Sequence, residues 1–280
     1  MGKVFAFLED DIFSLHAREE IFFYDLKENL ISFSRLKHPG ISIAKHQNYR
    51  DVLEERASQD GVAVTRRKTG GRFMYLDNND LVISFALQTK GSLQEDYALI
   101  CKLLVESLQE VTGERFQIDY VNDILHAAGR KIGGAAQQRD SFGEGGRSMV
   151  HAYLRYAVDP EQLFKYCALD GHPLVQYVDL LKDHVTCIRD FSDISFQKFF
   201  DMFCGALIQR IERVTQDKFH REDFSSYSQT LEEKRERYQD PVYISGSPEY
   251  QSRGHCDAIA GSGSASFLKI PALAGKVRYG

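Results

Sequence analysis

The chain has 280 residues, 43% of them hydrophobic, and carries a formal net charge of -5 with an isoelectric point near 6.0. A chain of this length and composition can bury one substantial core and has room for a small appended domain. A general nucleic-acid binder needs a dense Lys and Arg surface to displace phosphate counterions, so we expect no nucleic-acid partner.

The first half of the chain predicts a helix, a group of strands and a second helix. Apolar residues over 13–26 have the spacing of an amphipathic helix. Helical periodicity returns over 94–111, and Gly113 stands where a helix stop is expected. Between the two helices, short runs rich in β-branched and aromatic residues predict strands over 30–33, 40–44, 62–65, 73–76 and 81–87.

The second half predicts another strand group, over 117–125, 131–136 and 149–158. Asp159-Pro160-Glu161 then has the form of a cap with proline in the first turn of a helix, and 195–214 is again periodic. Strand groups that are each followed by helix predict an α+β fold, with packed helices on a largely antiparallel or mixed sheet over residues 1–215. Charged and Gly/Ser-rich runs predict a reduced accessory region or tail over 216–280.

Neither a membrane segment nor a disulfide framework is indicated. No run approaches the roughly 18 to 20 apolar residues that span a bilayer, and the acidic start of the chain lacks a signal-peptide pattern. The cysteines are odd in number and contain no C-x-x-C pair, so most are expected to be small buried apolar residues. We expect a cytoplasmic protein without a membrane partner. The cysteines are Cys101, Cys167, Cys187, Cys204 and Cys256.

A basic, glycine-containing turn connects two of the predicted strands. Consecutive glycines let a backbone approach an anion closely, and flanking guanidinium groups add charge and bidentate hydrogen bonds. The turn therefore suits a carboxylate or phosphate, although a solvated hairpin with incidental arginines would have the same composition. It reads Arg66-Arg67-Lys68-Thr69-Gly70-Gly71-Arg72-Phe73-Met74-Tyr75-Leu76-Asp77.

A second segment places a lysine among small residues. Such a lysine can bring its ammonium against a bound ligand because nothing bulky beside it blocks the approach. An exposed strand lysine near a tight bend fits the same residues. The segment comprises Asn122-Asp123, then Gly129-Arg130-Lys131-Ile132-Gly133-Gly134-Ala135-Ala136-Gln137, and His151 after the following loop.

Together these segments resemble the lipoate protein ligases of the biotin/lipoate protein ligase superfamily, which includes octanoyl transferases. The family signatures are Arg-Arg-x-Ser/Thr-Gly-Gly-Gly with a following aromatic residue and His-Asp, then Asn-Asp, Lys-Ile/Val-x-Gly-x-Ala and His-Gly. Weaker similarity at 43–48 and 184–187 extends the resemblance over roughly residues 10 to 215. Two motifs in the right order are more specific than either alone.

The resemblance implies the biotin/lipoate ligase catalytic fold over 1–215. It also implies activation of lipoate or octanoate by ATP to acyl-AMP, and acyl transfer to a lysine of a lipoyl carrier domain of the 2-oxoacid dehydrogenase or glycine cleavage H-protein type. Lys131 would be catalytic, Asp123 would bind Mg²⁺, and Phe73 and Tyr75 would line an apolar slot for the acyl chain. The positions implied for binding substrate and ATP are Arg66, Arg67, Thr69, Gly70, Gly71, Arg72, Tyr75, Asp77, Asn122, Asp123, Gly133, Gly134, Ala135 and His151.

Departures from the ligase pattern leave two alternatives. Arg72, Leu76 and Ala152 stand where glycine, histidine and glycine are usual, and the Gly-Gly-Arg form resembles a branch of octanoyl transferases that carry the acyl group on a cysteine. Cys167 would then be the nucleophile, with no need for ATP. The other alternative is a non-catalytic relative that binds an acyl ligand or a carrier. Because 216–280 is short compared with the family's second domain, a separate accessory subunit is a further expected partner.

Overall fold

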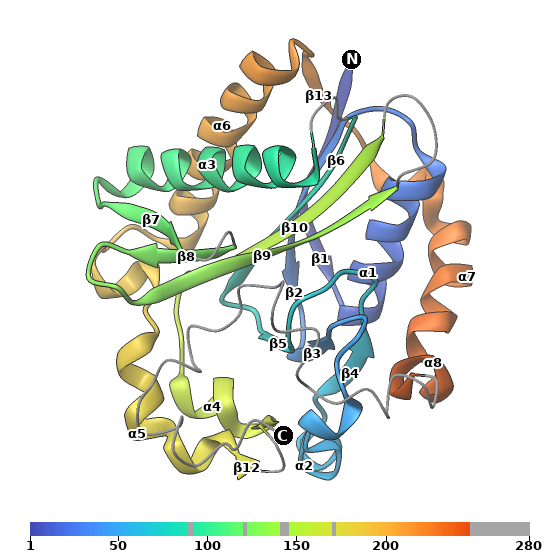
Figure 1. Cartoon of the computed structure of the whole chain (residues 1–280). Helices are drawn as coiled ribbons and strands as arrows, with labels where there is room; N and C mark the ends of the chain where they lie inside the picture. Colours follow the sequence, from blue (N-terminus) through green and yellow to red (C-terminus); the bar gives the residue numbers. More distant parts are fainter. Residues whose placement is uncertain (89–91, 120–121, 141–145, 170–171, 247–280) are drawn as a thin grey trace.

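An eight-stranded mixed sheet is the main element of the computed structural model, which describes residues 1–88, 92–119, 122–140, 146–169 and 172–246 (Figure 1). The strand order is β13-β1-β2-β6-β10-β9-β8-β7. β1 pairs in parallel with β13 and with β2, and the other pairs are antiparallel. The α+β prediction is confirmed. The strands are β1 Gly2–Asp10, β2 Leu30–Leu36, β6 Asp80–Gln88, β7 Phe116–Asp119, β8 Asp123–His126, β9 Lys131–Asp140, β10 Arg147–Arg155 and β13 Phe219–Arg221.

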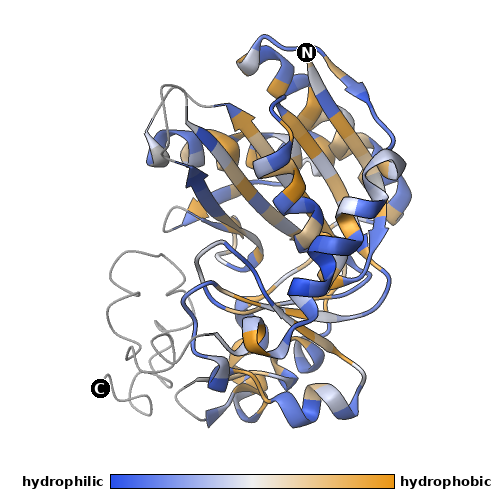
Figure 2. Ribbon diagram, turned by 90° about the vertical axis from the view of Figure 1, so that its right-hand side faces the viewer, coloured by the Kyte–Doolittle hydropathy of each residue, from blue (hydrophilic) through white to orange (hydrophobic). Residues whose placement is uncertain are grey.

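Both faces of this sheet are covered. Alternate strand residues point to opposite faces, so Val4 and Ile31 join one hydrophobic cluster while Phe5 and Leu30 join another. Helices α3 (Leu93–Thr112) and α6 (Phe196–Thr215) pack on the first face. Helix α1 (Ile12–Glu20), the π-helical turn η1 (Ile21–Asp25) and α7 (Ser228–Gln239) lie on the second. Figure 2 shows the hydrophobic strand residues behind the largely hydrophilic ribbon of α7.

A three-stranded sheet and several short helices form a second layer below the large sheet in Figure 1. Its strand order is β4-β3-β5, and its own core contains Ile41, Ile43, Tyr75 and Phe164. The elements are β3 Gly40–Ile43, η2 Tyr49–Asp51, α2 Glu54–Gln59, β4 Ala63–Arg66, β5 Met74–Leu76, α4 Pro160–Lys165, β11 Ala168–Leu169, β12 His172–Pro173, η3 Leu174–Tyr177, α5 Val178–Leu181, η4 Lys182–His184 and η5 Ile188–Asp190.

The described part of the predicted accessory region packs against both layers. β13 extends the large sheet, and η6 (Phe224–Tyr227) adds Phe224 to the cluster around Phe5. The charged run at 230–240 forms most of α7, which is followed by α8 (Pro241–Ser245). The Gly/Ser-rich run at 247–266 and Cys256 lie outside the described residues. Within the described part of the chain, no helix combines the length and apolar character needed to cross a bilayer.

Candidate functional site

A cleft is lined by residues from the large sheet, the small sheet and the short helices, and its empty space, including the part open to solvent, is about 1170 Å³. The glycine turn after β4 forms one wall, and the start of β9 with the end of β10 forms the opposite wall. Both segments that the sequence singled out therefore face the same space. The lining residues are Gln47, Asp51, Arg67, Gly71, Arg72, Phe73, Met74, Tyr75, Asn122, Asp123, Lys131, Gly134, Ala135, Ala136, His151, Tyr153, Arg155, Leu163, Phe164, Ala168, Leu174 and Val185.

Arg67 fixes the shape of the glycine turn. Its Nη2 donates to the carbonyls of Gly70 and Arg72 at 2.8 and 2.6 Å, and its Nη1 donates to the carbonyl of Ser42 at 2.7 Å. Burial lowers the pKa of Arg67 to about 10, so the group stays charged at neutral pH. Gly71 has a φ of 95°, which favours glycine, and a Cβ there would lie 3.0 Å from Arg67 Nη2. The Arg67 guanidinium is thus held by the backbone carbonyls of the turn and carries its positive charge to the wall of the cleft.

On the opposite wall, Lys131 lies at the first position of β9 and donates from Nζ to Asp123 Oδ1 at 2.6 Å. Burial alone would lower the pKa of Lys131, but Tyr153 and Asp123 outweigh it and raise the pKa. Asp123 is 1% exposed. The ammonium is therefore charged and kept in one direction, as a group that stabilises developing negative charge must be.

Two glycines make room for this arrangement. A Cβ on Gly134 would lie 3.5 Å from both Lys131 Cε and Tyr153 Cε1, so a larger side chain would compete for the space in front of the lysine. A Cβ on Gly133 would lie only 2.2 Å from the carbonyl oxygen of Tyr153 on the neighbouring strand. Gly133 itself does not line the cleft, so its contribution is close packing of β9 on β10.

Asn122 supplies a polar atom without a partner. Its Nδ2 donates to the carbonyl of Ala135 at 3.2 Å, while its buried Oδ1 accepts no hydrogen bond from the described residues. A buried, unsatisfied amide oxygen costs free energy, so a bound group that donates to it or coordinates it is favoured. Asn122 and Asp123 together present oxygen ligands to the cleft, which suit a hard cation.

The sequence reasoning missed Tyr153 and Arg155, which also line the cleft. Arg155 is buried and donates to Asp80 Oδ1 at 3.1 Å. Burial raises the pKa of Asp80 to about 7, although Arg155 opposes the rise. These residues could have been found, because His151, Tyr153 and Arg155 alternate along one predicted strand and therefore share one face.

The cleft has an apolar side, at the place where the sequence predicted a slot for an acyl chain. Phe73 and Tyr75 line it as expected, and Met74, Leu163, Phe164, Leu174 and Val185 also contribute. Tyr75 stacks on Tyr166 with ring centroids 5.7 Å apart. Leu163, Phe164 and Leu174 were not predicted at the site, because their short helices meet β5 only through tertiary packing, whereas Val185 belongs to the segment 184–187 that resembles the family.

Several predicted site residues do not line the cleft. Arg66 donates to the carbonyls of Ala44, Gln47 and Ile244 at 2.7 to 2.9 Å, so its guanidinium connects β4 to the segment after β3 and to α8. Asp77 Oδ1 accepts from the amide of Asn79 in the β5–β6 turn. The others outside the lining are Thr69, Gly70, Gly133 and Cys167.

Cys167 is poorly placed to act as a nucleophile. Its side chain is fully buried in the core of the small layer, and burial raises the pKa of its thiol well above the ordinary value. A thiol attacks as the thiolate, so this environment opposes the reaction. The other described cysteines, Cys101, Cys187 and Cys204, are also buried, and none of them is in a disulfide within the described part of the chain.

Known proteins resemble this chain in sequence. The family model described as the lipoyl protein ligase A/B catalytic domain matches residues 11–208. The lipoate-protein ligase LplJ of Bacillus subtilis is 29% identical over 122 residues, which cover 43% of this chain and 35% of that protein. This chain thus matches only about a third of that relative's length.

Solved structures share the fold. A bipartite lipoate protein ligase of Thermoplasma acidophilum, studied with its E2 lipoyl domain, matches with a TM-score of 0.75 at 19% identity, covering 88% of this chain and 97% of that one. A lipoate-protein ligase A bound with ATP matches with a TM-score of 0.69 at 20% identity, covering 89% and 98%. Because the family model spans most of the chain and includes both walls of the cleft, the chain belongs to the lipoyl protein ligase A/B catalytic-domain family.

Proposed function

We propose that the protein is an ATP-dependent lipoate protein ligase, which activates lipoate or octanoate and transfers it to a carrier-domain lysine. The observation that carries this proposal is that the Lys131 ammonium and the backbone of the Gly71 turn line one cleft with an apolar side. Family membership, and the names of the lipoate ligases it resembles, support the same chemistry.

Each of the two steps develops negative charge in the cleft. In the first, a carboxylate oxygen attacks the α-phosphorus of ATP and pyrophosphate leaves, giving acyl-AMP. In the second, a lysine amine attacks the acyl carbonyl, AMP leaves, and the amine loses a proton. Lys131 is proposed as the group that contacts the carbonyl and phosphate oxygens. Gly71 and Arg67 provide backbone and charge on the other side, in a geometry fixed before the substrate binds.

Magnesium fits the oxygen atoms of this wall. The unpartnered Oδ1 of Asn122 and the carboxylate of Asp123 would hold it together with substrate phosphates, as Mg²⁺ sites in nucleotide enzymes commonly do. The ion would neutralise phosphate charge. Lys131, Asn122 and Asp123 would keep the phosphate oriented for attack. Arg72 and Tyr75 are proposed as further contacts to the acyl adenylate.

The acceptor is proposed to be a lipoyl carrier domain of the 2-oxoacid dehydrogenase or glycine cleavage H-protein type. The Thermoplasma ligase was studied with an E2 lipoyl domain, which supports this class of partner. That ligase is bipartite, which supports a separate accessory subunit as a further partner. A cytoplasmic location remains part of the proposal.

One incubation tests the proposal. The purified protein is mixed with ATP, Mg²⁺, lipoate and a lipoyl domain, and the domain is weighed by mass spectrometry while released pyrophosphate is measured. The expected result is a lipoyl mass gain that depends on ATP. Acyl transfer from an acylated carrier without ATP, lost in Cys167→Ser, would instead establish the transferase. Lipoate binding with neither reaction would indicate the non-catalytic relative.

A further inference from the structure

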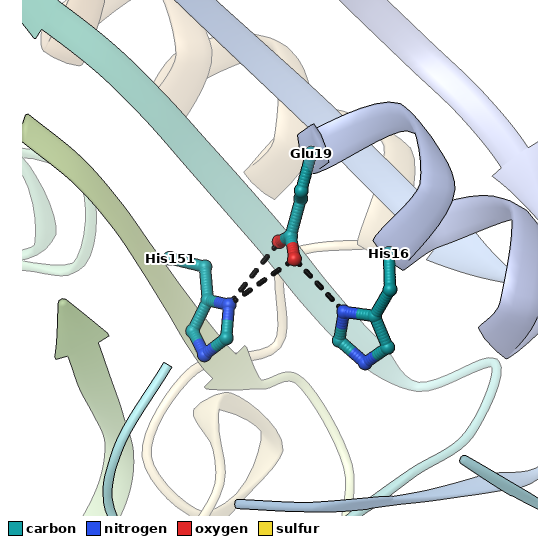
Figure 3. A group of neighbouring side chains, drawn as sticks. All are labelled: His16, Glu19 and His151. Carbon is teal, nitrogen blue, oxygen red and sulfur yellow. Dashed lines mark hydrogen bonds and ion pairs between the residues drawn. The ribbon is translucent and has the colours of Figure 1, made fainter. Parts of the chain in front are cut away.

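A buried cluster of side chains connects α1 to the Nδ1 atom of His151. The Glu19 carboxylate lies between the rings of His16 and His151 (Figure 3). Its Oε2 is 2.8 Å from His16 Nδ1, and its Oε1 is 3.2 Å from His151 Nδ1 and 2.7 Å from Ser84 Oγ. His16, Glu19 and His151 are each at most 3% exposed. Burial alone would raise the pKa of Glu19, but its histidine partners hold it well below the usual range.

One assignment of donors and acceptors satisfies all the hydrogen bonds of Glu19, His16 and His151. An ionised Glu19 only accepts, so both Nδ1 atoms donate, and in neutral rings both Nε2 atoms then accept. Their partners are hydroxyls: Ser42 Oγ is 2.8 Å from His16 Nε2, and Thr69 Oγ1 is 3.1 Å from His151 Nε2. Burial lowers the pKa of His16, which agrees with a neutral ring.

From Thr69 the chain of hydrogen bonds reaches the glycine turn. Thr69 Oγ1 accepts from Arg67 Nε at 3.0 Å, and the same guanidinium donates to the carbonyls of Gly70 and Arg72. Thr69 is 1% exposed and does not line the cleft, so its hydroxyl is used within the protein. A change at Glu19 can therefore reach Arg67 through these hydrogen bonds, in addition to the direct electrostatic effect of the carboxylate on the guanidinium.

We propose that Glu19 is a positioning residue, which acts through His151 and Thr69 on Arg67 and so sets the conformation of the turn at residues 67–72. The sequence of contacts is carboxylate to imidazole, imidazole to hydroxyl, and hydroxyl to guanidinium. Only the statement that this turn binds the activated acid rests on the proposed function. The positioning itself is a property of the protein alone.

The same three side chains could also hold a metal ion, since their ligand atoms lie within 4.8 Å of one another. The hydrogen bonds favour positioning instead. Both histidines use both ring nitrogens, and Glu19 Oε1 also accepts from Ser84. An ion would have to break the bonds to Glu19 in a site closed to solvent.

Hydrogen exchange in the full chain tests the proposal without any substrate. The amide of Arg67 donates to the carbonyl of Ile43, and the amide of Lys45 donates to the carbonyl of Thr69, so both report on the turn. Glu19→Gln should speed exchange in peptides containing these amides by about tenfold or more, as expected for loss of a hydrogen bond to a charged group. Exchange in α6 should not change, and the exposed control Glu55→Gln should match wild type.

Substitutions at Thr69, which connects His151 to Arg67, test the proposal independently of Glu19. Thr69→Val removes the hydroxyl at similar volume and should speed exchange at the same amides, whereas Thr69→Ser keeps the hydroxyl and should restore slow exchange. Unchanged exchange at the turn in Thr69→Val, or a uniform increase that includes α6 in both Glu19→Gln and Thr69→Val, would overturn the proposal. Stoichiometric zinc in the purified wild type, lost in Glu19→Gln, would also overturn it.

Ligase kinetics separate this inference from the proposed function. Where wild type releases pyrophosphate, Glu19→Gln and Thr69→Val should each lower kcat about tenfold or more, and Thr69→Ser should stay near wild type. Where wild type releases none, the proposed function fails, and the exchange rates at the turn still decide whether Glu19 positions it.

Discussion

The Lys131 ammonium lies at the wall of the cleft and also forms an ion pair with a buried carboxylate. Asp123 is 1% exposed and lies 2.6 Å from Lys131 Nζ. Removing the lysine would take away a short hydrogen bond to that buried carboxylate, a change that costs stability. The residue is thus both the proposed catalytic group and a partner in a buried ion pair.

We therefore expect Lys131→Ala to lower acyl-adenylate formation by a factor of about 10² to 10³ or more, the size seen when one preorganised donor is removed from a reacting centre. It should also lower the free energy of unfolding by about 1 to 3 kcal/mol, because Asp123 loses its hydrogen bond from the Lys131 ammonium. Pyrophosphate release and urea denaturation measure the two effects. Lys102→Ala, an exposed lysine on α3, is the control. Near wild-type turnover in Lys131→Ala would remove Lys131 from its proposed role.

At the scale of elements, β9 and β10 approach closely because Gly133 has no side chain. A Cβ there would lie 2.2 Å from the carbonyl oxygen of Tyr153, which is backbone and cannot turn away. We expect Gly133→Ala to lower the free energy of unfolding by about 1 to 3 kcal/mol, as overpacking usually does. Gly70→Ala is the matched control, since nothing lies within 4 Å of its Cβ. Equal unfolding midpoints for the two variants would contradict this account.

Glu20 joins α1 to α7 and to the basic turn. It contacts Lys68 at 2.9 Å, Lys234 at 3.2 Å and Arg237 at 2.9 Å, and Tyr238 donates to it at 3.0 Å. Burial alone would raise its pKa, but these cations lower it from 4.5 to about 2. The folded state thus favours the ionised form. The resulting stabilisation is complete above pH 4.5 and is lost as the pH falls from about 4.5 towards 2.

Glu20→Gln should therefore destabilise the protein by up to about 3 kcal/mol at pH 7, taking 1.36 kcal/mol for each unit of pKa shift. The difference from wild type should shrink at pH 3. Urea denaturation at both pH values measures it, with Glu55→Gln as an exposed control that should show no difference. A destabilisation that is the same at pH 7 and pH 3 would argue against the ion pairs as its source.

The elements that the sequence predicted best are those whose signals are local. The predicted helix at 94–111 is α3, with a Ser92 and Glu95 capping box and Gly113 at a φ of 75°. Asp159 caps α4 as expected. By contrast, the single strand expected over 117–125 is two antiparallel strands, β7 and β8, which pair with each other up to Asp119 and Asp123. No strand was expected at β1.

The charged helix α7 could not be predicted because its stability comes from contacts outside it. It has few apolar residues, and its anchors are Tyr238, which is 1% exposed, and the cations that bind Glu20. The same limit applies to the site. The glycine turn and Lys131 are visible as motifs, whereas Glu19 and His16 belong to a helix whose pattern shows only amphipathicity. Their role depends on His151, over 130 residues away in the chain.

At the scale of the whole molecule, residues after 215 contribute to the structure that holds the site. Thr65 Oγ1 donates to the carbonyl of Tyr238, and Arg66 donates to the carbonyls of Ile244 and Ser245. The strand that leads into the glycine turn is therefore bonded to α7 and α8. The proposed boundary at residue 215 separates these partners, so it can be tested by cutting the chain there.

We expect the fragment 1–215 to be much less stable than the fragment 1–246, which keeps every described contact. The shorter fragment loses β13 and Phe224, and it uncovers Phe5 and Phe22, which stack on each other at 5.0 Å and each pack against Phe224 at 5.6 Å. Loss of one buried phenylalanine alone costs about 3 to 5 kcal/mol, which corresponds to roughly 10 °C in Tm for a domain of this size. Thermal unfolding followed by circular dichroism compares the two. Equal Tm values would mean that residues 216–246 are an independent appendage and that the glycine turn keeps its conformation without α7 and α8.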